Sequence, residues 1–417
     1  MNKKIRFREL TEKYALPLSI RTMRYLDRWV GLFLCFFLSG INYFLKIISF
    51  GKKQDKHIRK ILIIKLSEMG AIILSCPFIK FVREGYPDAD IFFLTFKENA
   101  PVLNFFNINP KLNVLTVRKG SIGLFLVDVF YAIKILRNEK IDIVFDLELF
   151  SRISAILTYA IGGLKKIGFY NYCIEGLYRG DFLTHKVQYN PLIHISESFI
   201  SLYLASKESE KKLPYIGQRI NKNKIVLPKF FPSSDMKIKM RDKLNARGIK
   251  EKDKLVIFNL GDGIIPLREW PLENFTSIAK KILAKDCWII LVGTKKFSER
   301  SSLFMKCLSD LRCIDFSGVT TLPEILTLLS MSVLAVAGDC GLAHLASLVD
   351  ARIFVFFGPE TPQVYSPLGK NTRIFYANLL CSPCFSAFNN RKSACKMNEC
   401  LKAIKVGEVY QTLKEYL

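Results

Sequence analysis

The sequence is poor in acidic residues: 37 Asp and Glu stand against 62 Lys and Arg, which gives a formal net charge of +25. It also has no internal repeat and no low-complexity tract, and half of its residues are hydrophobic, which argues against a repeat array or a disordered chain. The cationic excess suits an anionic partner, such as nucleic acid, an acidic membrane surface or a phosphorylated substrate. Basic residues are not interleaved with aromatic ones and no nucleic-acid-binding module is recognisable, so we expect no nucleic acid partner.

A secretory signal is missing as well. The first 28 residues are basic and polar, and no small-residue cleavage site follows the apolar run behind them. The 11 cysteines do not imply a disulfide framework, because a chain of 417 residues rich in apolar side chains can build a full core without one. We therefore expect a reducing, cytoplasmic compartment.

One apolar segment near the N-terminus predicts contact with a membrane. Trp29 to Leu45 is a run of 17 residues without charge, with Trp29 and Tyr43 placed as interfacial anchors would be. A span needs about 20 residues, and basic residues on both sides oppose translocation of either flank. The pattern favours a helix lying in the cytoplasmic leaflet, with a true span and a helix packed on the protein as alternatives.

The rest of the chain predicts an α/β fold. Short apolar, β-branched runs alternate with helix-length segments, which is typical of parallel sheets covered on both faces. Two such sets predict two doubly wound domains whose ligands bind at the carboxyl ends of the strands. The runs are residues 61–64, 91–94, 114–117 and 141–145, then 255–258, 288–292, 333–337 and 353–357. The predicted segments are a membrane-associating part at 1–55, an N-terminal domain at 56–220, a linker at 221–254, a C-terminal domain at 255–380, and a Cys-rich tail with a closing helix at 381–417.

The strand ends of the first half carry candidate acceptor and base residues. The turn after the first strand holds Ser67 and Gly70, and its open backbone N–H groups suit an anion or an acceptor hydroxyl. Asp146 and Glu148 end the fourth strand and share one face by strand alternation, so either can serve as a general base. The alternative is structural, with one carboxylate capping the next helix and the other pairing with Arg152.

The strand ends of the second half carry candidate donor residues. After the strand at 255–258, Gly261 and Gly263 are followed by Pro266 where a dinucleotide fingerprint needs Gly or Ala, which argues against a nicotinamide or flavin enzyme. Arg268 follows this turn and can bind a phosphate bidentately, although it can also be a solvated surface arginine. The strongest local signal is the turn at Asp339, where a buried strand breaks and a helix begins, as diphosphate binding at a helix N-terminus requires. The predicted donor site consists of Arg268, Gly338, Asp339, Cys340, Gly341, His344, Gly358 and Thr361.

In this order the motifs resemble glycosyltransferase family 9, the family of lipopolysaccharide heptosyltransferases, from Lys60 to nearly the end of the chain. The matching segments read ILIIKLSEMGAIILSCPF, IPLREWPLENF, AGDCGLAHLAS and FFGPETP. The resemblance implies a GT-B fold of two facing Rossmann-like domains, inversion at the anomeric carbon, and no cofactor for catalysis. It implies a nucleotide-diphosphate-sugar donor, often ADP-heptose, and a lipid-linked saccharide acceptor bound at Ser67, Gly70 and Arg152. The enzyme would then work on the anionic surface at the cytoplasmic face of the bacterial inner membrane, as a peripheral or monotopic protein.

Two positions depart from the family pattern. The usual Asp-Ser-Gly is Asp339-Cys340-Gly341, which keeps the backbone. The family's catalytic Asp after the glycine of the first turn is Ala71 here, so another carboxylate would have to act as the base, and we favour Glu148 over nearby Glu68. General-base catalysis contributes about 10²–10⁴-fold to the rate, so the alternative is an inactive relative that binds nucleotide-sugar or scaffolds other enzymes.

Four cysteines cluster near the C-terminus. Cys381, Cys384, Cys395 and Cys400 form two close pairs. In a reducing compartment such pairs favour a structural metal, zinc first and iron second, with free thiols and disulfides as alternatives.

Overall fold

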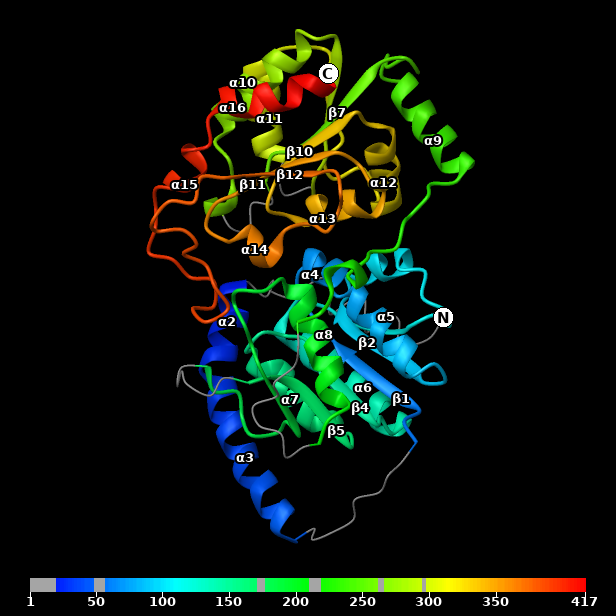
Figure 1. Ribbon diagram of the computed structural model, residues 1–417, viewed down its shortest axis with the longest axis vertical. Coiled ribbons are helices and arrows are strands. Elements are labelled where there is room, and N and C mark those ends of the chain that lie inside the picture. Colours follow the sequence, from blue (N-terminus) through cyan, green and yellow to red (C-terminus); the bar gives the residue numbers. More distant parts are fainter. Residues whose placement is uncertain (1–19, 49–56, 171–176, 210–218, 262–265, 295–297) are drawn as a thin grey trace. The chain divides into compact units, whose positions relative to one another are not determined.

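The protein was analysed as a computed structural model that describes residues 20–48, 57–170, 177–209, 219–261, 266–294 and 298–417 (Figure 1). The chain divides into two compact units. The first comprises Met1–Glu68, Ser75–Asn190 and Ser196–Ile225, and the second comprises Met69–Leu74, Pro191–Ile195 and Val226–Leu417. Each unit contains one six-stranded sheet.

The sheet of the first unit is parallel throughout and has the strand order β3-β2-β1-β4-β5-β6. This is the order of a doubly wound dinucleotide-binding fold, in which the chain changes direction between the first and fourth strands. The strands are β1 (Lys60–Ile64), β2 (Asp90–Phe96), β3 (Asn113–Val117), β4 (Ile143–Asp146), β5 (Lys165–Tyr170) and β6 (His185–Gln188). The carboxyl ends of β1 and β4 therefore lie side by side at the switch point, with Ile64 opposite Asp146.

Helices cover both faces of this sheet. One face buries apolar side chains of α6 and α7 against β1, β2 and β4 in a single core. The helical elements of the unit are α2 (Ile20–Arg28), α3 (Val30–Ile48), α5 (Cys76–Gly85), the 3-10 helix η1 (Ala100–Phe105), α6 (Ile122–Glu139), α7 (Arg152–Ile161), α8 (Ile195–Ser206) and the 3-10 helix η3 (Lys222–Lys224).

The sheet of the second unit repeats this topology. Its order is β12-β11-β10-β7-β8-β9, so β7 and β10 are the neighbours at its switch point. The strands are β7 (Lys254–Asn259), β8 (Cys287–Leu291), β9 (Cys313–Asp315), β10 (Leu334–Gly338), β11 (Ile353–Phe357) and β12 (Thr372–Tyr376). Two doubly wound sheets confirm the predicted fold class.

The helices of the second unit include the C-terminal tail. Its last helix packs with α10 in the main core, and fully buried Trp270 stacks on Phe356 with ring centroids 4.2 Å apart and donates its indole N–H to the Ile404 carbonyl at 3.2 Å. The elements are α4 (Met69–Leu74), α9 (Ser234–Asn245), the 3-10 helix η4 (Pro266–Arg268), α10 (Leu272–Leu283), α11 (Ser298–Leu308), α12 (Leu322–Met331), α13 (Gly341–Leu348), α14 (Pro362–Tyr365), α15 (Glu399–Lys402), α16 (Val406–Leu413) and the 3-10 helix η6 (Lys414–Tyr416).

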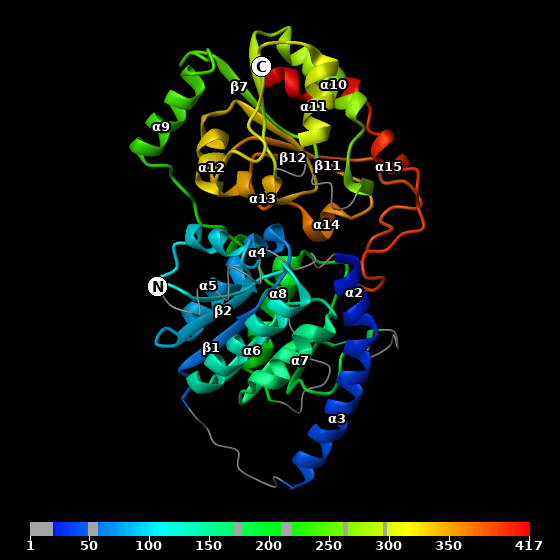
Figure 2. The same cartoon turned by 180° about the vertical axis from the view of Figure 1, so that it is seen from behind.

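The predicted membrane-associating segment forms α2 and α3, which lie along α7 in the first unit (Figures 1 and 2). Thr22–Leu45 is long and apolar enough to cross a bilayer, although length and composition alone are weak evidence for a span. The α2 end of this pair is fixed to the first unit, because Asp27 caps α7 by accepting hydrogen bonds from the Arg152 and Ile153 amides at 2.9 and 2.8 Å.

Candidate active site

At the switch point of the first sheet, Glu148 binds the turn that follows β1. Its carboxylate Oε1 accepts hydrogen bonds from the Leu66 and Ser67 amides at 2.7 and 3.0 Å, and Oε2 lies 2.9 Å from Lys65 Nζ. Only 6% of the Lys65 side chain and 10% of the Glu148 side chain are exposed. Glu148 therefore joins the end of β4 to the turn after β1, and it satisfies backbone donors that the turn would otherwise leave open.

Asp146 does not share this environment, although strand alternation predicted a common face. Its carboxylate is fully buried, forms an ion pair with Arg179, and accepts from the Ser154 hydroxyl at 3.0 Å. Burial raises the pKa of Asp146 against the opposing effect of Arg179. The strand ends at Asp146, so Glu148 belongs to the following loop and points elsewhere.

Arg179 is a residue that the sequence analysis missed. Besides pairing with Asp146 it donates to the Glu148 carbonyl at 3.0 Å and to the Ser154 hydroxyl at 2.9 Å. A buried arginine that binds the ends of both β4 and α7 holds the switch point in shape. A single arginine between glycine and tyrosine gives no sequence signal for this role.

The turn after β1 has an unusual backbone at Glu68. This residue adopts a left-handed φ of 66°, and its side chain is exposed at the carboxyl edge of the sheet. Non-glycine residues in this region are uncommon, and such strain is concentrated at functional sites. Ser67 beside it is half-buried, and its backbone amide donates a hydrogen bond to the Glu148 carboxylate. Ala71 is buried in α4.

Gly70 has a steric reason to be glycine. Within the second unit, a Cβ at this position would lie 2.4 Å from Cδ2 of His344. His344 is itself buried in the first turn of α13, so its ring packs against the backbone of α4. Larger residues at position 70 would displace that ring.

Arg152, the third predicted acceptor residue, begins α7 beneath the N-terminal helices. Its side chain is 5% exposed, and a Cβ added at Gly31 would lie 2.9 Å from its Cβ. Cys35 of α3 also contacts its carbonyl oxygen. The structure thus places Arg152 in the packing between α3 and α7.

In the second unit, Asn259 at the switch point forms hydrogen bonds with residues that follow β7, β8 and β10. Its side-chain amide donates to the Val292 carbonyl at 2.9 Å, and its oxygen accepts from the Gly261 amide at 3.2 Å and from the Cys340 thiol at 3.5 Å. A Cβ at Gly338 would lie 3.0 Å from the carbonyl oxygen of Arg268, so a larger residue would require this backbone to shift. Asn259 was not predicted; its only signal is a polar residue that ends an apolar strand.

Four charged side chains meet beside this turn. Arg268 Nη2 lies 2.7 Å from Glu360 Oε1, and its Nε lies 3.6 Å from Asp339 Oδ2. Arg391 from the Cys-rich tail reaches the same Glu360 oxygen at 2.9 Å. Two cations and two carboxylates, all largely buried, form a balanced network at the carboxyl edge of the sheet, so hydrogen-bond donors and acceptors lie side by side there.

The helix α13 begins at Gly341 directly after this network. Its N-cap is Cys340, whose side chain makes no capping hydrogen bond. The Ala343 amide donates to the Cys340 carbonyl at 3.2 Å, so the Gly341 and Leu342 amides are the groups at this helix end that suit an added acceptor. A positive helix dipole end beside Arg268 attracts an anion. Predicted residues Gly338, Asp339, Cys340 and Arg268 are therefore brought together by the fold.

The two donor residues predicted in the next turn, Gly358 and Thr361, have structural roles. Thr361 is the N-cap of α14 and accepts from the Gln363 amide at 3.2 Å. Gly358 packs under the tail, since a Cβ there would lie 2.7 Å from Leu401 Cγ and 3.0 Å from Cys400 Sγ. The acidic residue between them, Glu360, is the one that reaches Arg268, and sequence reasoning overlooked it.

The four clustered cysteines are free thiols. Over the described parts of the chain, no group of three or more His, Cys, Asp or Glu side chains is arranged to hold a metal ion. Burial raises the pKa of Cys400, helped by the nearby thiols of Cys384 and Cys395. The predicted zinc or iron site finds no support in this geometry.

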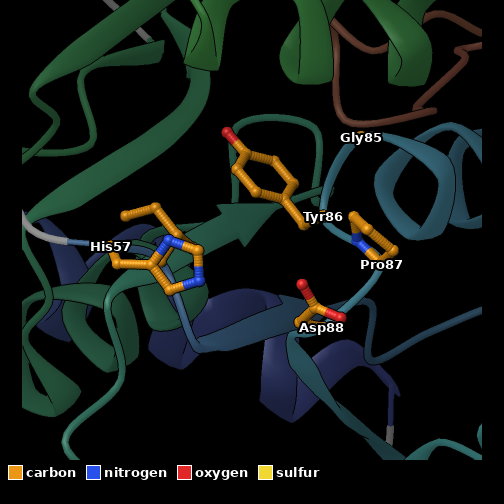
Figure 3. A pocket seen from close by; sticks show the side chains of 6 residues that line it. His57, Gly85, Tyr86, Pro87 and Asp88 are labelled. Atoms are coloured by element: carbon orange, nitrogen blue, oxygen red, sulfur yellow. The ribbon is translucent and has the colours of Figure 1, made fainter.

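A shallow pocket of about 280 Å³ lies elsewhere on the first unit (Figure 3). It is lined by His57, Ile58, Gly85, Tyr86, Pro87 and Asp88. These residues precede β1 and β2, so the pocket lies at the amino ends of the strands. Ligands of doubly wound folds bind at the opposite edge, and no predicted site residue lines this pocket.

Comparison with known proteins identifies the family. Residues 129–394 match the family described as "Glycosyltransferase family 9 (heptosyltransferase)". The chain belongs to glycosyltransferase family 9. Lipopolysaccharide heptosyltransferase 3 of Escherichia coli K12 is 23% identical over 329 residues, which cover 74% of this chain and 85% of that protein. Lipopolysaccharide heptosyltransferase 2 of Salmonella typhimurium is 25% identical over 123 residues, and the match spans only 35% of its length and 29% of this chain.

Solved structures support the GT-B fold of this family member. The E. coli ADP-heptose lipopolysaccharide heptosyltransferase II has a TM-score of 0.64 at 19% identity, with 86% of this chain and 98% of that chain covered. A family 9 glycosyltransferase from Veillonella parvula has a TM-score of 0.65 at 17% identity, with 86% and 97% covered. About one seventh of this chain therefore has no counterpart in proteins that are themselves matched almost completely.

Proposed function

We propose that the protein is an active inverting glycosyltransferase that moves a heptose or related sugar from a nucleotide-diphosphate donor to a lipopolysaccharide core acceptor. The observation that carries this proposal is the Arg268–Asp339–Glu360 network at the open N-terminus of α13, in a chain of glycosyltransferase family 9. ADP-heptose is the expected donor. A related E. coli heptosyltransferase of the same fold has been solved with ADP, which supports this choice.

The donor chemistry follows from the charges at this site. The diphosphate would accept hydrogen bonds from the first N–H groups of α13 and from Arg268, which together offset the charge that grows on the leaving nucleotide. The carboxylates of Asp339 and Glu360 would accept hydrogen bonds from sugar hydroxyls. Arg268 already touches both carboxylates, at 3.6 and 2.7 Å, so it is held in place before a donor arrives.

Transfer with inversion needs one proton acceptor. The acceptor hydroxyl oxygen forms its bond to the anomeric carbon as the bond to the phosphate breaks, the nucleotide leaves with that electron pair, and a base takes the hydroxyl proton. The sequence offered Glu148 and Glu68 for this role. Only 10% of the Glu148 side chain is exposed and its carboxylate binds the turn after β1, whereas Glu68 is exposed to solvent at the same edge, on a backbone with a left-handed φ of 66°. We therefore favour Glu68 as the base and Glu148 as a residue that positions the turn.

The buried Ala71 supports a second candidate function, an inactive relative that binds nucleotide-sugar without turnover. The two functions differ in one measurement. An active enzyme loses turnover in Glu68→Gln while donor binding persists, and an inactive relative binds donor without turnover in either form.

The place of action would be the cytoplasmic face of the inner membrane, where a lipid-linked saccharide is presented on an anionic surface. The net charge of +25 and the apolar α2–α3 segment support a peripheral or monotopic enzyme there. A nucleic acid is not among the proposed partners.

A screen of ADP-, UDP- and GDP-sugars by thermal shift tests the donor site. A ligand that binds only the native state stabilises it by about 2.7 kcal/mol at a hundredfold excess over its dissociation constant. We expect ADP-sugars to raise the apparent Tm and Arg268→Ala to reduce the rise. A cooperative melt with no shift for any donor would contradict the proposal.

A further inference from the structure

The helix α3 is apolar on nearly its whole circumference. Only a narrow seam, including Gly31 and Cys35, is buried against the first unit. Phe33, Phe36 and Phe37 are 70%, 76% and 66% exposed. A surface helix of a soluble domain carries polar residues on its outer side, so this face is suited to an apolar environment.

The seam is fixed to the domain along most of its length. At one end Asp27 caps α7, and near the other end Asn42 donates to the Asp181 carbonyl at 2.9 Å. Between them the Ser39 hydroxyl accepts from the Tyr178 hydroxyl at 2.9 Å and from the Asp181 amide at 2.8 Å. Asp27 to Asn42 covers about 22 Å of helix at a rise of 1.5 Å per residue. A crossing α3 would therefore carry α7 and its buried charges into the hydrocarbon.

A second helix of the same layer has an apolar outer face. In α6 the residues that point away from the sheet are apolar from Ile122 to Ile135, except Gly123 and Lys134. Leu126, Phe130 and Tyr131 are 57%, 65% and 51% exposed. The domain's own packing gives no reason for these side chains, because the opposite face of α6 already fills the core.

The two helices belong to one layer. Both α3 and α6 contact α7, and Met23 of α2 packs on the same core as Phe125 and Val129 of α6. Figure 2 shows α6, α7 and the α2–α3 pair side by side on one face of the first unit. We call the exposed apolar side chains of this layer the outer apolar surface. They are Tyr25, Trp29, Val30, Phe33, Leu34, Phe36, Phe37, Ile41, Tyr43, Phe44, Leu45, Ile47 and Ile48 of the α2–α3 segment, and Ile122, Leu126, Val127, Phe130, Tyr131 and Ile135 of α6.

The area of this surface is large for a monomer. An aromatic side chain offers roughly 150–250 Å², so the exposed phenylalanines and tyrosines alone leave more than about 600 Å² open. Monomeric soluble proteins rarely expose continuous apolar patches above a few hundred Å². The size of this exposed area favours a partner that covers it.

The charges of the layer indicate the chemistry of that partner. Its three acidic residues are all engaged: Asp27 caps α7, Asp128 pairs with Arg118 at 2.8 Å, and Glu139 pairs with Lys60 at 2.5 Å. The exposed ionic groups of these helices include the cations Arg28, Lys134 and Arg137, and the exposed carboxylate of Asp181 beside α3 is paired with Lys186 at 2.5 Å. Apolar side chains rimmed by cations match an anionic lipid surface, whereas a second copy would bring like charges together.

We infer that the outer apolar surface lies flat on an anionic bilayer, with α2, α3 and α6 all parallel to the membrane plane and inserted to headgroup depth. The inference rests on the proposed function only for the identity of the membrane, since its acceptor is a lipid-linked saccharide. It adds α6, a helix of the glycosyltransferase domain itself, to the contact. It also makes α3 a monotopic anchor, because α3 cannot leave α7.

Vesicle flotation of the full chain tests this surface. The probes are phosphatidylcholine vesicles with and without about one third phosphatidylglycerol. The key variant is L126E/F130E on α6, and F36E/F37E on α3 is its counterpart. The matched control is L311E/V319E, which changes two side chains of the second unit that are 95% and 69% exposed. Unchanged apparent Tm and unchanged donor-induced thermal shift establish that each variant is folded and separate this test from the donor proposal.

The inference predicts binding to anionic vesicles that falls at least about tenfold in either key variant and not in the control. Loss in the α3 variant with full binding in the α6 variant would overturn it, since α3 would then act alone. Failure of the unchanged protein to float with anionic vesicles would also overturn it. Self-association that L126E/F130E abolishes in sedimentation velocity would then assign the surface to a second copy.

Discussion

Replacing Glu148 by Gln separates a structural carboxylate from a catalytic one. The amide oxygen of Gln can still accept from the Leu66 and Ser67 amides, but its NH₂ group would face Lys65 Nζ, which the carboxylate now approaches at 2.9 Å. Lys65 is only 6% exposed, so the substitution leaves a buried cation without its counter-ion. Breaking a buried pair from one side costs about 3–5 kcal/mol.

The lower end of that range predicts a fall in the apparent Tm of roughly 6–12 °C, since about 1 kcal/mol shifts the Tm of a domain of this size by roughly 2–4 °C. Differential scanning calorimetry measures it. The matched control is Glu139→Gln, which removes an ion pair to Lys60 with 37% of the Glu139 side chain exposed, and a surface pair of this kind contributes less than about 1 kcal/mol.

The same variants are then assayed for sugar transfer. Glu68→Gln is expected to keep the Tm, because its side chain is exposed, and to lower kcat by about 10²–10⁴-fold. Glu148→Gln at a temperature where it is folded is expected to lose much less. An unchanged Tm with a kcat loss of that size in Glu148→Gln would refute this reasoning and return the base to Glu148.

Two further predictions concern the second unit. Arg268→Ala removes a charge-assisted contact of about 1.5–3 kcal/mol, so the dissociation constant of the donor should rise by roughly 10–100-fold in calorimetric titration; an unchanged constant would remove Arg268 from the site. In alkylation followed by mass spectrometry, exposed Cys381 and Cys395 should react well before buried Cys400, whose pKa is raised by burial, and a chelator should change nothing; protection of all four clustered thiols that a chelator relieves would instead establish a bound metal.

The strands that form the middle of each sheet are predictable from sequence, because burial on both faces forces continuous apolar runs. The runs at 61–64 and 353–357 appear as β1 and β11 almost residue for residue. Among the strands nearer the sheet edges, β3 was predicted from the run at 114–117, but β5 and β9 were not. β5 begins with two lysines and contains a glycine, and β9 has only three residues, so neither forms a continuous apolar run.

The candidate site was predictable where backbone geometry defines it. The turn at Asp339 could be placed because a strand must end and a helix begin there. The partners of Arg268 and Glu148 could not, since an ion pair such as Arg391 to Glu360 joins residues far apart in the chain. Asp146 and Glu148 were assigned one face because the strand was taken to continue past Asp146, where it in fact ends.

The outer apolar surface explains a feature that composition alone left open. The run from Trp29 to Leu45 is short for a span, and its sequence favours a leaflet helix, with a span and a packed helix as alternatives. The hydrogen bonds of Asp27, Ser39 and Asn42 argue against the span, and the exposed rings of α3 argue against the packed helix.

Sugar transfer itself is the most direct measurement. Purified protein is incubated with ADP-heptose and delipidated lipopolysaccharide core, and the product is analysed by mass spectrometry and by the NMR coupling of the new anomeric proton. We predict one added heptose with an anomeric configuration opposite to that of the donor, lost in Glu68→Gln and Arg268→Ala. Donor binding without any product across core acceptors would contradict the assignment of an active transferase, and product with retained configuration would contradict the inverting mechanism.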